Sequence, residues 1–286
     1  MDYTTVDYMV LTKSQQAAIA HIDSLSKGSS IDRSLRITLN FHPDHTHDNL
    51  HMLDSLAETG IYKSQFETLT SNGGLTAHPG GDRWNWESRI FSTAYDNTEP
   101  GERPKYGSLN YKSSQYGGSP RFGSAYLRLK QDVLNRTTFC YPDSVFEPKA
   151  FGTAQHMVLI ELAQADNKDL LDDYVEAQVH GELSLTCDVE ALVLDPSYKD
   201  TTIEEMADKL DCKIEWHNGF RLSIKEMQKH PDYRGSEYIE LGREIAQEEI
   251  LTPRIIGIAA ATGKYDQQDL KRVWHYLARF GQDSLT

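Results

Sequence analysis

A strict alternation of apolar and polar side chains predicts a β-strand over residues 35–42. The apolar positions are Leu35, Ile37, Leu39 and Phe41, and the polar positions between them are Arg36, Thr38, Asn40 and His42. Because successive side chains of a strand point to opposite faces, the apolar set predicts a buried face. The polar set predicts a face that meets solvent or a binding site.

Two later segments, residues 122–130 and 174–180, show the same division into an apolar and a polar face. The polar faces carry Ser124, Tyr126 and Arg128 in the first segment and Glu176, Gln178 and His180 in the second. One such face is usually plain surface of a half-solvated sheet. Three of them in one chain favour a sheet whose polar face lines a cleft.

Helical periodicity and capping residues flank these strands. The pattern predicts helices over residues 12–26, with Thr12 or Ser14 as the N-cap, and over 48–59, 153–164, 203–210, 236–248 and 266–280. We therefore expect an α+β fold in a single domain. Residues 1–34 would form an N-terminal helical segment and residues 201–286 a helix-rich C-terminal subdomain.

A glycine-rich, polar region separates the first two strands. Loops of this length in a compact protein are usually functional or disordered. The region carries too many aromatic residues for a disordered linker, namely Trp84, Trp86, Phe91, Tyr106, Tyr111 and Phe122. We expect it to be ordered and to face a ligand, with the pairs Gly73/Gly74 and Gly80/Gly81 allowing close backbone approach.

Composition narrows the function classes. The 286 residues include 29 basic and 43 acidic side chains, a net charge of −14, which argues against nucleic-acid binding. We expect no membrane span, because no apolar stretch approaches roughly 18 residues, and no secretory signal peptide, because the start MDYTTVDYMVL lacks the basic-then-apolar order of one. The three cysteines, Cys140, Cys187 and Cys212, lie far apart in the sequence and predict a reducing compartment.

Most of the negative charge lies in one segment. Residues 161–200 contain eleven acidic and two basic side chains. This excess fits a solvated face that aids solubility, and it fits equally well a docking surface for a basic partner.

Established motifs are largely absent. The chain has no GxGxxG, GxxxxGK[ST], GxSxG or HExxH pattern, which disfavours a Rossmann oxidoreductase, a P-loop NTPase and an α/β-hydrolase. The segment HPDHTHDNLH offers His42, Asp44, His45, His47 and His51 as ligands, so a histidine-metal hydrolase is an alternative. Clustered histidines without cysteines or a Glu-His pair are a weakly specific signal of metal binding. We therefore expect no metal.

The three polar faces carry an arginine, a serine and a glutamate in that chain order. An arginine can grip a diphosphate or a ribose through its planar donor fork. A carboxylate can bind a ribose hydroxyl and stabilise the oxocarbenium-like charge that develops when nicotinamide leaves. This inventory favours ADP-ribosyl transfer from NAD⁺. A module that binds NAD⁺ or ADP-ribose without chemistry is the other alternative.

Five segments resemble the hallmark blocks of a bacterial family that includes the CteC-type effectors, which mono-ADP-ribosylate ubiquitin on a threonine. They are RITLNFHPD (36–44), SQFETLTSNGGLTAHPGGDR (64–83), KYGSLNY (105–111), SPRFGSAYLRL (119–129) and YVEAQVHGELSLTCDVEALVLDPSY (174–198). The resemblance implies an ADP-ribosyltransferase-like fold, with two small sheets around an NAD⁺ cleft and flanking helices. It also implies a mono-ADP-ribosyltransferase that uses NAD⁺ as a substrate and blocks ubiquitination.

The resemblance places the arginine, serine and glutamate signature at Arg36, Ser124 and Glu176, with Arg36 and Glu176 as catalytic residues. Ser108 and Ser119 remain alternatives for the serine, and Gln178 and Glu190 for the glutamate.

Other residues complete the expected site. The cofactor-binding set is Arg36, Thr38, His42, Tyr106, Ser124 and Gln178, with Tyr106 as a candidate to stack on nicotinamide. Glu176 or His180 would take the proton of the acceptor hydroxyl.

The expected acceptor is a threonine of ubiquitin, docked by the acidic segment 161–200. We expect a monomer that resides in the bacterial cytoplasm before export and acts as an effector in the host cytosol.

Overall fold

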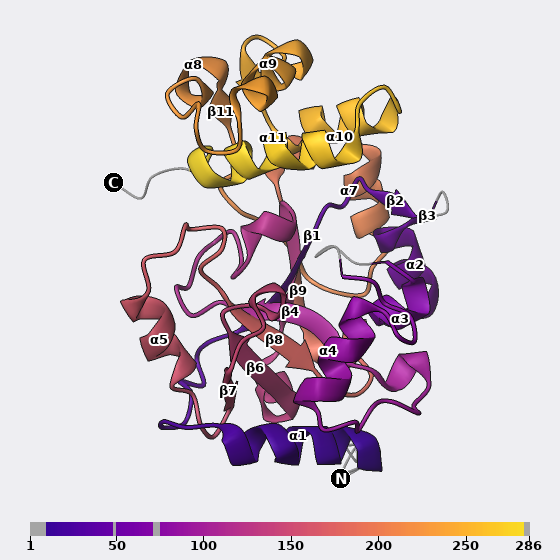
Figure 1. Cartoon of the computed structure of the whole chain (residues 1–286). Helices are drawn as coiled ribbons and strands as arrows, with labels where there is room; N and C mark the ends of the chain where they lie inside the picture. Colours follow the sequence, from indigo (N-terminus) through magenta and orange to yellow (C-terminus); the bar gives the residue numbers. More distant parts are fainter. Residues whose placement is uncertain (1–9, 48–49, 71–74, 283–286) are drawn as a thin grey trace.

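The computed structural model describes residues 10–47, 50–70 and 75–282 (Figure 1). Its centre is an eight-stranded sheet with the order β10-β9-β5-β1-β4-β8-β6-β7. The pair β9/β10 is parallel and the other pairs are antiparallel, so the sheet is mixed. The α+β class is confirmed. The expected two small sheets are not present among the described residues, because β4 joins β1 to β8 and makes one continuous sheet.

The strands of this sheet are short. They are β1 Ile37–Phe41, β4 Lys105–Leu109, β5 Ala125–Leu129, β6 Thr137–Tyr141, β7 Ala150–Thr153, β8 Val175–Val179, β9 Val189–Leu194 and β10 Ile214–Trp216. Two small ribbons lie outside it, β2 Thr46–His47 with β3 Leu50–His51 and β11 Leu222–Ser223 with β12 Ile250–Leu251.

Helices surround the sheet. The α-helices are α1 Lys13–Leu25, α2 Met52–Thr59, α3 Gln65–Thr68, α4 Asp82–Ile90, α5 Leu159–Ala165, α6 Leu185–Asp188, α7 Thr202–Ala207, α8 Ile224–Met227, α9 Ser236–Ile245, α10 Pro253–Ala261 and α11 Gln267–Phe280. Short 3₁₀ turns are η1 Pro100–Glu102, η2 Pro120–Phe122, η3 Gln131–Arg136, η4 Ser144–Phe146 and η5 Pro196–Tyr198. No described helix has the length and apolar character needed to cross a membrane.

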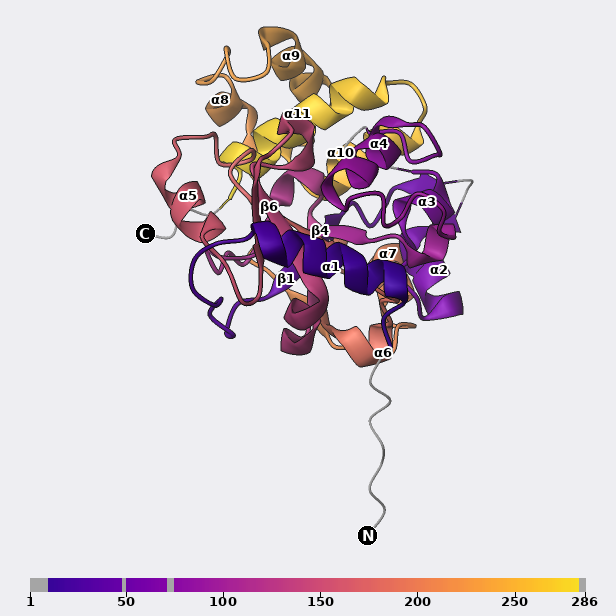
Figure 2. The ribbon, with the colours of Figure 1, turned by 60° about the horizontal axis from the view of Figure 1, so that its bottom comes forward.

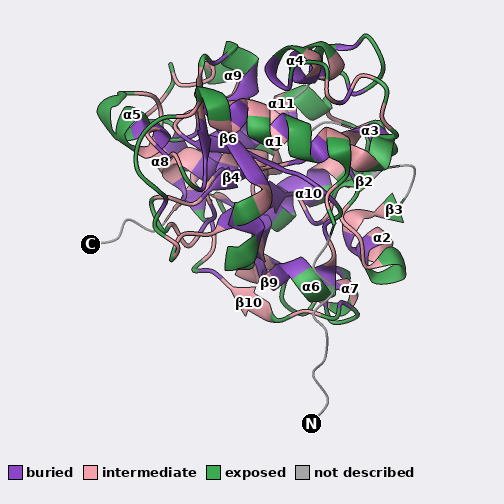
Figure 3. Ribbon diagram, turned by 90° about the horizontal axis from the view of Figure 1, so that it is seen from below, coloured by how far each residue is buried: buried purple, intermediate pink, exposed green. Residues whose placement is uncertain are grey.

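Helices α1 and α4 cover one face of the sheet. Ala18 and Ile22 of α1 and Trp86 and Ile90 of α4 form one apolar cluster with Cys140 of β6. Figure 2 shows α1 crossing in front of the strands, and Figure 3 shows its outer side exposed while β4 and β6 are buried. This is the face to which the polar side chains of β1 and β8 point, so these polar positions are covered rather than solvated.

The opposite face carries the main apolar core. Its strand residues include Leu39, Leu127 and Ala177, and they pack with Leu159 of α5 and Ile203 of α7. The apolar face expected for residues 35–42 is therefore confirmed. Thr12 caps α1 through a capping box with Gln15, as one of the two expected N-caps.

The C-terminal helices have a core of their own. It is formed mainly by residues from Phe220 to Ala278, and Figure 1 shows α8–α11 gathered at the end of the molecule opposite α1. Trp274 of α11 links this core to the sheet layer, because its Nε1 donates to the carbonyls of Pro120 and Arg121 at 3.2 and 3.0 Å. Residues 201–219, which the sequence assigns to the C-terminal subdomain, include α7 and β10, and these pack with the main sheet.

Two predictions from the sequence fall wholly or partly on residues that the structure does not describe. Gly73 and Gly74 lie outside the described residues, as do the first two positions of the helix expected over 48–59. The described part of that helix is α2, which begins at Met52.

Candidate functional site

Strand register places the predicted polar side chains in neighbouring rows on one face of the sheet. Thr38 of β1 pairs with Ser108 of β4, and Ser108 pairs with Glu176 of β8. The next row contains Tyr106 and Gln178. Strand β4, which sequence analysis placed within a long irregular region, lies between the two strands it predicted and carries the polar face across.

These polar side chains are buried, which excludes the interpretation that they are ordinary surface. Thr38, Ser108 and Gln178 each expose at most 1% of their surface, and Glu176 exposes 6%. Buried polar groups require partners. Thr38 Oγ1 accepts from the Gly118 amide, and Thr138 Oγ1 donates to Gln178 Oε1.

A cavity of about 680 Å³ opens over this face. Its walls come from β1, β4 and β8 on the sheet side and from α2, α3 and the loops around them. The polar side chains that line it include Asn40, His42, His45, Arg83, Lys105, Tyr106, Ser119 and Glu176. The volume is in the range of ligand pockets in proteins.

Glu176 is a buried carboxylate in the wall of this cavity. Its Oε2 accepts from the Ser144 amide at 3.1 Å and from Ser144 Oγ at 2.8 Å. Its Oε1 accepts from Gln178 Nε2 at 3.0 Å. Burial raises the pKa of Glu176, while Arg83 and the two Ser144 hydrogen bonds oppose that rise. Both oxygens are thus held in place, as a catalytic carboxylate requires.

Arg83 of α4 is the guanidinium next to Glu176. Its Nη1 lies 4.0 Å from Glu176 Oε1 and donates to Ser144 Oγ at 2.8 Å. Its Cζ lies 3.9 Å from the centroid of the Tyr106 ring, which makes a cation–π contact. Sequence analysis missed Arg83 because α4 falls in the region taken as loop.

A signal for α4 does exist in the sequence. Its buried residues are Arg83, Trp86, Glu87 and Ile90, which follow the helical spacing i, i+3, i+4, i+7. Two of the four are charged, so the stripe is not visible in a search for apolar periodicity.

Tyr106 lines the cavity but is already engaged. Its hydroxyl donates to Glu87 Oε1 at 2.7 Å, and Arg103 Nη1 donates to Glu87 Oε2 at 2.6 Å. Arg83 covers one face of the ring, so a nicotinamide could stack only on the other. The expected stacking role remains compatible with this geometry.

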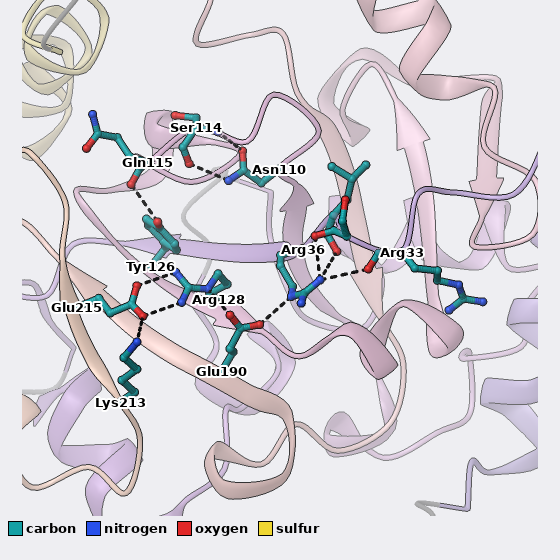
Figure 4. A network of polar contacts seen from close by, with 12 residues as sticks. Arg33, Arg36, Asn110, Ser114, Gln115, Tyr126, Arg128, Glu190, Lys213 and Glu215 are labelled. Carbon is teal, nitrogen blue, oxygen red and sulfur yellow. Dashed lines mark hydrogen bonds and ion pairs between the residues drawn. The ribbon is translucent and has the colours of Figure 1, made fainter. Parts of the chain in front are cut away.

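Arg36 lies outside the lining of the cavity. Its Nε donates to Glu190 Oε2 at 2.7 Å, and Arg128 donates to Glu190 Oε1 at 3.0 Å and to both oxygens of Glu215 (Figure 4). Arg36 Nη1 donates hydrogen bonds to the carbonyl oxygens of residues 33–35. The structure therefore places Arg36 and the alternative carboxylate Glu190 together in an ion-pair cluster and brings neither to Glu176.

The three candidate serines of the expected signature differ in their position relative to the cavity. Ser124 is fully buried and is not part of the cavity lining, and its carbonyl accepts from His217 Nε2 at 2.8 Å. Ser119 lines the cavity and accepts a hydrogen bond from Ser108 at 2.8 Å. Of the two alternative serines, Ser119 therefore lines the cavity, and Ser108 lies buried behind it.

His180 does not reach the cavity. It is completely buried between the Tyr95 hydroxyl, 2.6 Å from Nδ1, and Thr138 Oγ1, 2.9 Å from Nε2. Burial lowers its pKa to about 3. It is therefore a neutral structural group, and the expectation that it takes a substrate proton has no support in its position.

His42 and its neighbours form a second cluster in the cavity wall. The ligand atoms of His42, Asp44 and His45 all lie within 4.8 Å of one another. Burial lowers the pKa of His42 well below its ordinary value, with further contributions from His45, His275 and Lys271. His42 is thus a neutral imidazole. Among the described residues of the histidine-rich segment, these three side chains form a set that could hold a metal ion.

Part of the negative charge of the acidic segment 161–200 is paired within the molecule. Six of its eleven carboxylates form ion pairs with arginines or lysines of other segments: Asp169 with Arg279, Asp172 with Arg121, Asp173 with Lys112, Glu176 with Arg83, Asp188 with Arg136, and Glu190 with Arg36. The docking of a basic partner on this segment stays a prediction.

Comparison with models of known protein families gives a match over most of the chain. A search of curated proteins finds no similar sequence. The model of a family described as "Protein of unknown function (DUF3626)" matches residues 36–164 and 155–280, which include every strand of the main sheet, the cavity walls and the C-terminal helices. The chain belongs to this family of proteins of unknown function.

Proposed function

We propose that the protein is a mono-ADP-ribosyltransferase that transfers ADP-ribose from NAD⁺ to a protein hydroxyl and releases nicotinamide. The observation that carries this proposal is the Glu176 carboxylate, buried and fixed at both oxygens in the wall of the large cavity. A carboxylate so held can stabilise positive charge at the anomeric carbon of a ribose.

The reaction requires the bond between nicotinamide and the ribose to break. Nicotinamide leaves with the electron pair of that bond, and the ribose carbon becomes an oxocarbenium ion. The acceptor hydroxyl oxygen forms the new bond to this carbon, and its proton passes to Glu176 and from there to solvent. Glu176 must be ionised before the reaction, and its contacts with Arg83 and Ser144 favour that form.

Arg83 replaces Arg36 as the arginine of the proposed site. It is 3% exposed, and its contacts with Ser144 and Tyr106 leave its guanidinium fixed beside Glu176. We assign it as a positioning residue for the carboxylate. His42, Tyr106 and Ser119 face the same cavity and are the candidates to contact NAD⁺.

For the acceptor we propose a threonine of ubiquitin. The support for this is the resemblance of the five sequence blocks to the CteC-type effectors, which modify ubiquitin on a threonine. In such a role the protein would act in a host cytosol after export.

The test is the intact mass of ubiquitin after incubation with the protein and NAD⁺. We expect one added ADP-ribose with the unaltered protein and none with Glu176→Gln, which keeps the shape of the side chain but removes its charge. Glu190→Gln is the matched control, because Glu190 pairs with Arg36 and Arg128 outside the cavity lining.

Each outcome has a defined meaning. Transfer lost in both variants, or in Glu190→Gln alone, would contradict the assignment of Glu176. NAD⁺ consumed without any change in ubiquitin would support the reaction and overturn the acceptor. NAD⁺ bound but never consumed would favour a binding module.

A further inference from the structure

The segment that follows β1 gathers three metal-binding side chains in four residues. His42, Asp44 and His45 lie on the turn between β1 and β2, and their ligand atoms are within 4.8 Å of one another. We infer that these three side chains form a binding site for a divalent transition-metal ion.

The donor set fits such an ion. Two imidazoles and one carboxylate are the ligands of many zinc sites and of the 2-His-1-carboxylate sites of non-haem iron. Neither Mg²⁺ nor Ca²⁺ favours two nitrogen ligands, since both prefer oxygen. Three protein ligands also leave room for water or a substrate oxygen at the ion.

The surroundings of Asp44 resemble the outer shell of a metal site. The Tyr198 hydroxyl donates to Asp44 Oδ2 at 2.7 Å, which fixes the carboxylate and leaves its other oxygen for a ligand. Such hydrogen bonds orient metal-binding carboxylates in proteins. Helix α10 also packs against this carboxylate, because a Cβ built at Gly257 would lie 1.6 Å from the same oxygen.

The position of the cluster gives the ion a route of access. His45 is exposed, and both His42 and His45 line the cavity that Glu176 also lines. His51 lines the cavity as well, and its buried Nδ1 has no hydrogen-bond partner among the described residues. An ion at the cluster would therefore border the cavity and could attract an anionic group such as a diphosphate. The metal site itself does not depend on the proposed reaction.

The experiment is a titration of the full-length protein with Zn²⁺ after removal of metal with a chelator. We expect one Zn²⁺ per chain by calorimetry, and a visible absorption spectrum when Co²⁺ replaces the colourless Zn²⁺. His45→Ala is the principal variant, because His45 is exposed and we expect its removal to leave the fold intact. The affinity should fall by more than about 100-fold, since even the loss of an outer-shell partner costs about 10- to 100-fold.

Two further variants sharpen the test. Tyr198→Phe keeps all three ligands and removes only the hydrogen bond to Asp44, so Zn²⁺ should bind about tenfold more weakly. His21→Ala is the matched control, because His21 lies on α1, which packs on the other end of the sheet layer. It should bind Zn²⁺ with unchanged affinity.

The inference is overturned if the unaltered protein binds no Zn²⁺, or if His45→Ala binds as tightly as His21→Ala. Equal affinity in those two variants would mean that the ion binds elsewhere on the surface.

Discussion

The side chain on which the site depends is Glu176. Burial raises the pKa of its carboxyl, and the charge of Arg83 and the two hydrogen bonds from Ser144 counteract that rise. The same residue in an open strand would be an ordinary surface glutamate. Its contacts with η4 and α4 make it a fixed carboxylate in a cavity wall, which is the property that the proposed reaction requires.

Variants of Arg83 and Arg36 test which of the two arginines supports catalysis by Glu176. Arg83→Lys removes the planar fork that contacts Tyr106 and Ser144, so Glu176 loses part of its support. We expect kcat for ADP-ribosyl transfer to fall by about 100-fold with little change in the KM for NAD⁺, since small misplacements of reacting groups have effects of that size.

Arg36→Ala is the partner variant. Arg36 is partly exposed and pairs with Glu190, so its loss should lower the free energy of unfolding by roughly 1 kcal/mol and leave kcat within about twofold. Urea unfolding and steady-state kinetics on both variants check this. A larger loss of kcat in Arg36→Ala than in Arg83→Lys would return the catalytic arginine to Arg36.

The pH dependence of stability should report His180. Its pKa is about 3 in the folded protein and about 6.5 in the unfolded chain, so only the unfolded chain takes up a proton between these values. The contribution of neutral His180 is fully present above pH 6.5 and is lost as the pH falls toward 3.

Urea unfolding at pH 7.5 and pH 5 checks this expectation. The loss of stability on acidification should be smaller in His180→Gln, which does not titrate, than in the unaltered protein. Identical losses in the two proteins would show that His180 is not buried as a neutral group.

At the scale of elements, alternation and helical period predicted β1, β5, β8, α1 and α11, because each has one apolar face against a core. The pattern could not predict β4, in which Lys105 and Gly107 interrupt the apolar positions. It also missed α4, which buries Arg83 and Glu87. Strand β4 and the Arg83 side chain of α4 contribute to the cavity wall. The polar face of the sheet was therefore predictable from the sequence, whereas the arginine beside Glu176 was not.

The sequence placed Arg36 at the site because its alternation puts Arg36 on the same polar face as Glu176. Alternation shows which face a side chain belongs to, and it does not show which side chains of that face are neighbours. The position along each strand and the direction of each side chain are set by tertiary contacts. In the folded chain Arg36 turns toward Glu190, and Glu176 meets Arg83.

The packing of α10 against the turn after β1 gives a prediction for that helix. Alanine normally stabilises a helix relative to glycine by about 1 kcal/mol. At Gly257 the added methyl group would collide with the Asp44 carboxylate, so Gly257→Ala should instead lower the unfolding temperature. Differential scanning calorimetry measures the change, with Ile258→Ala and Ile258→Gly as a reference pair for helix propensity at an exposed position of α10. A raised unfolding temperature would show that α10 does not pack on Asp44.

At the scale of the whole molecule, one large sheet has a covered polar face with the Glu176 cavity over it, and the C-terminal helices form a separate core. Charges that appear as an acidic block in the sequence are distributed into ion pairs between segments. The buried carboxylate of Glu176 lies in the cavity wall and pairs with Arg83.

We propose that the bond between nicotinamide and ribose breaks in this cavity with the help of Glu176. The most direct measurement is the release of free nicotinamide from NAD⁺ by the purified protein, with ubiquitin present, beside Glu176→Gln at equal concentration. We predict steady release by the unaltered protein and a loss of at least about 100-fold in the variant. Release at the same rate by both proteins would contradict the account.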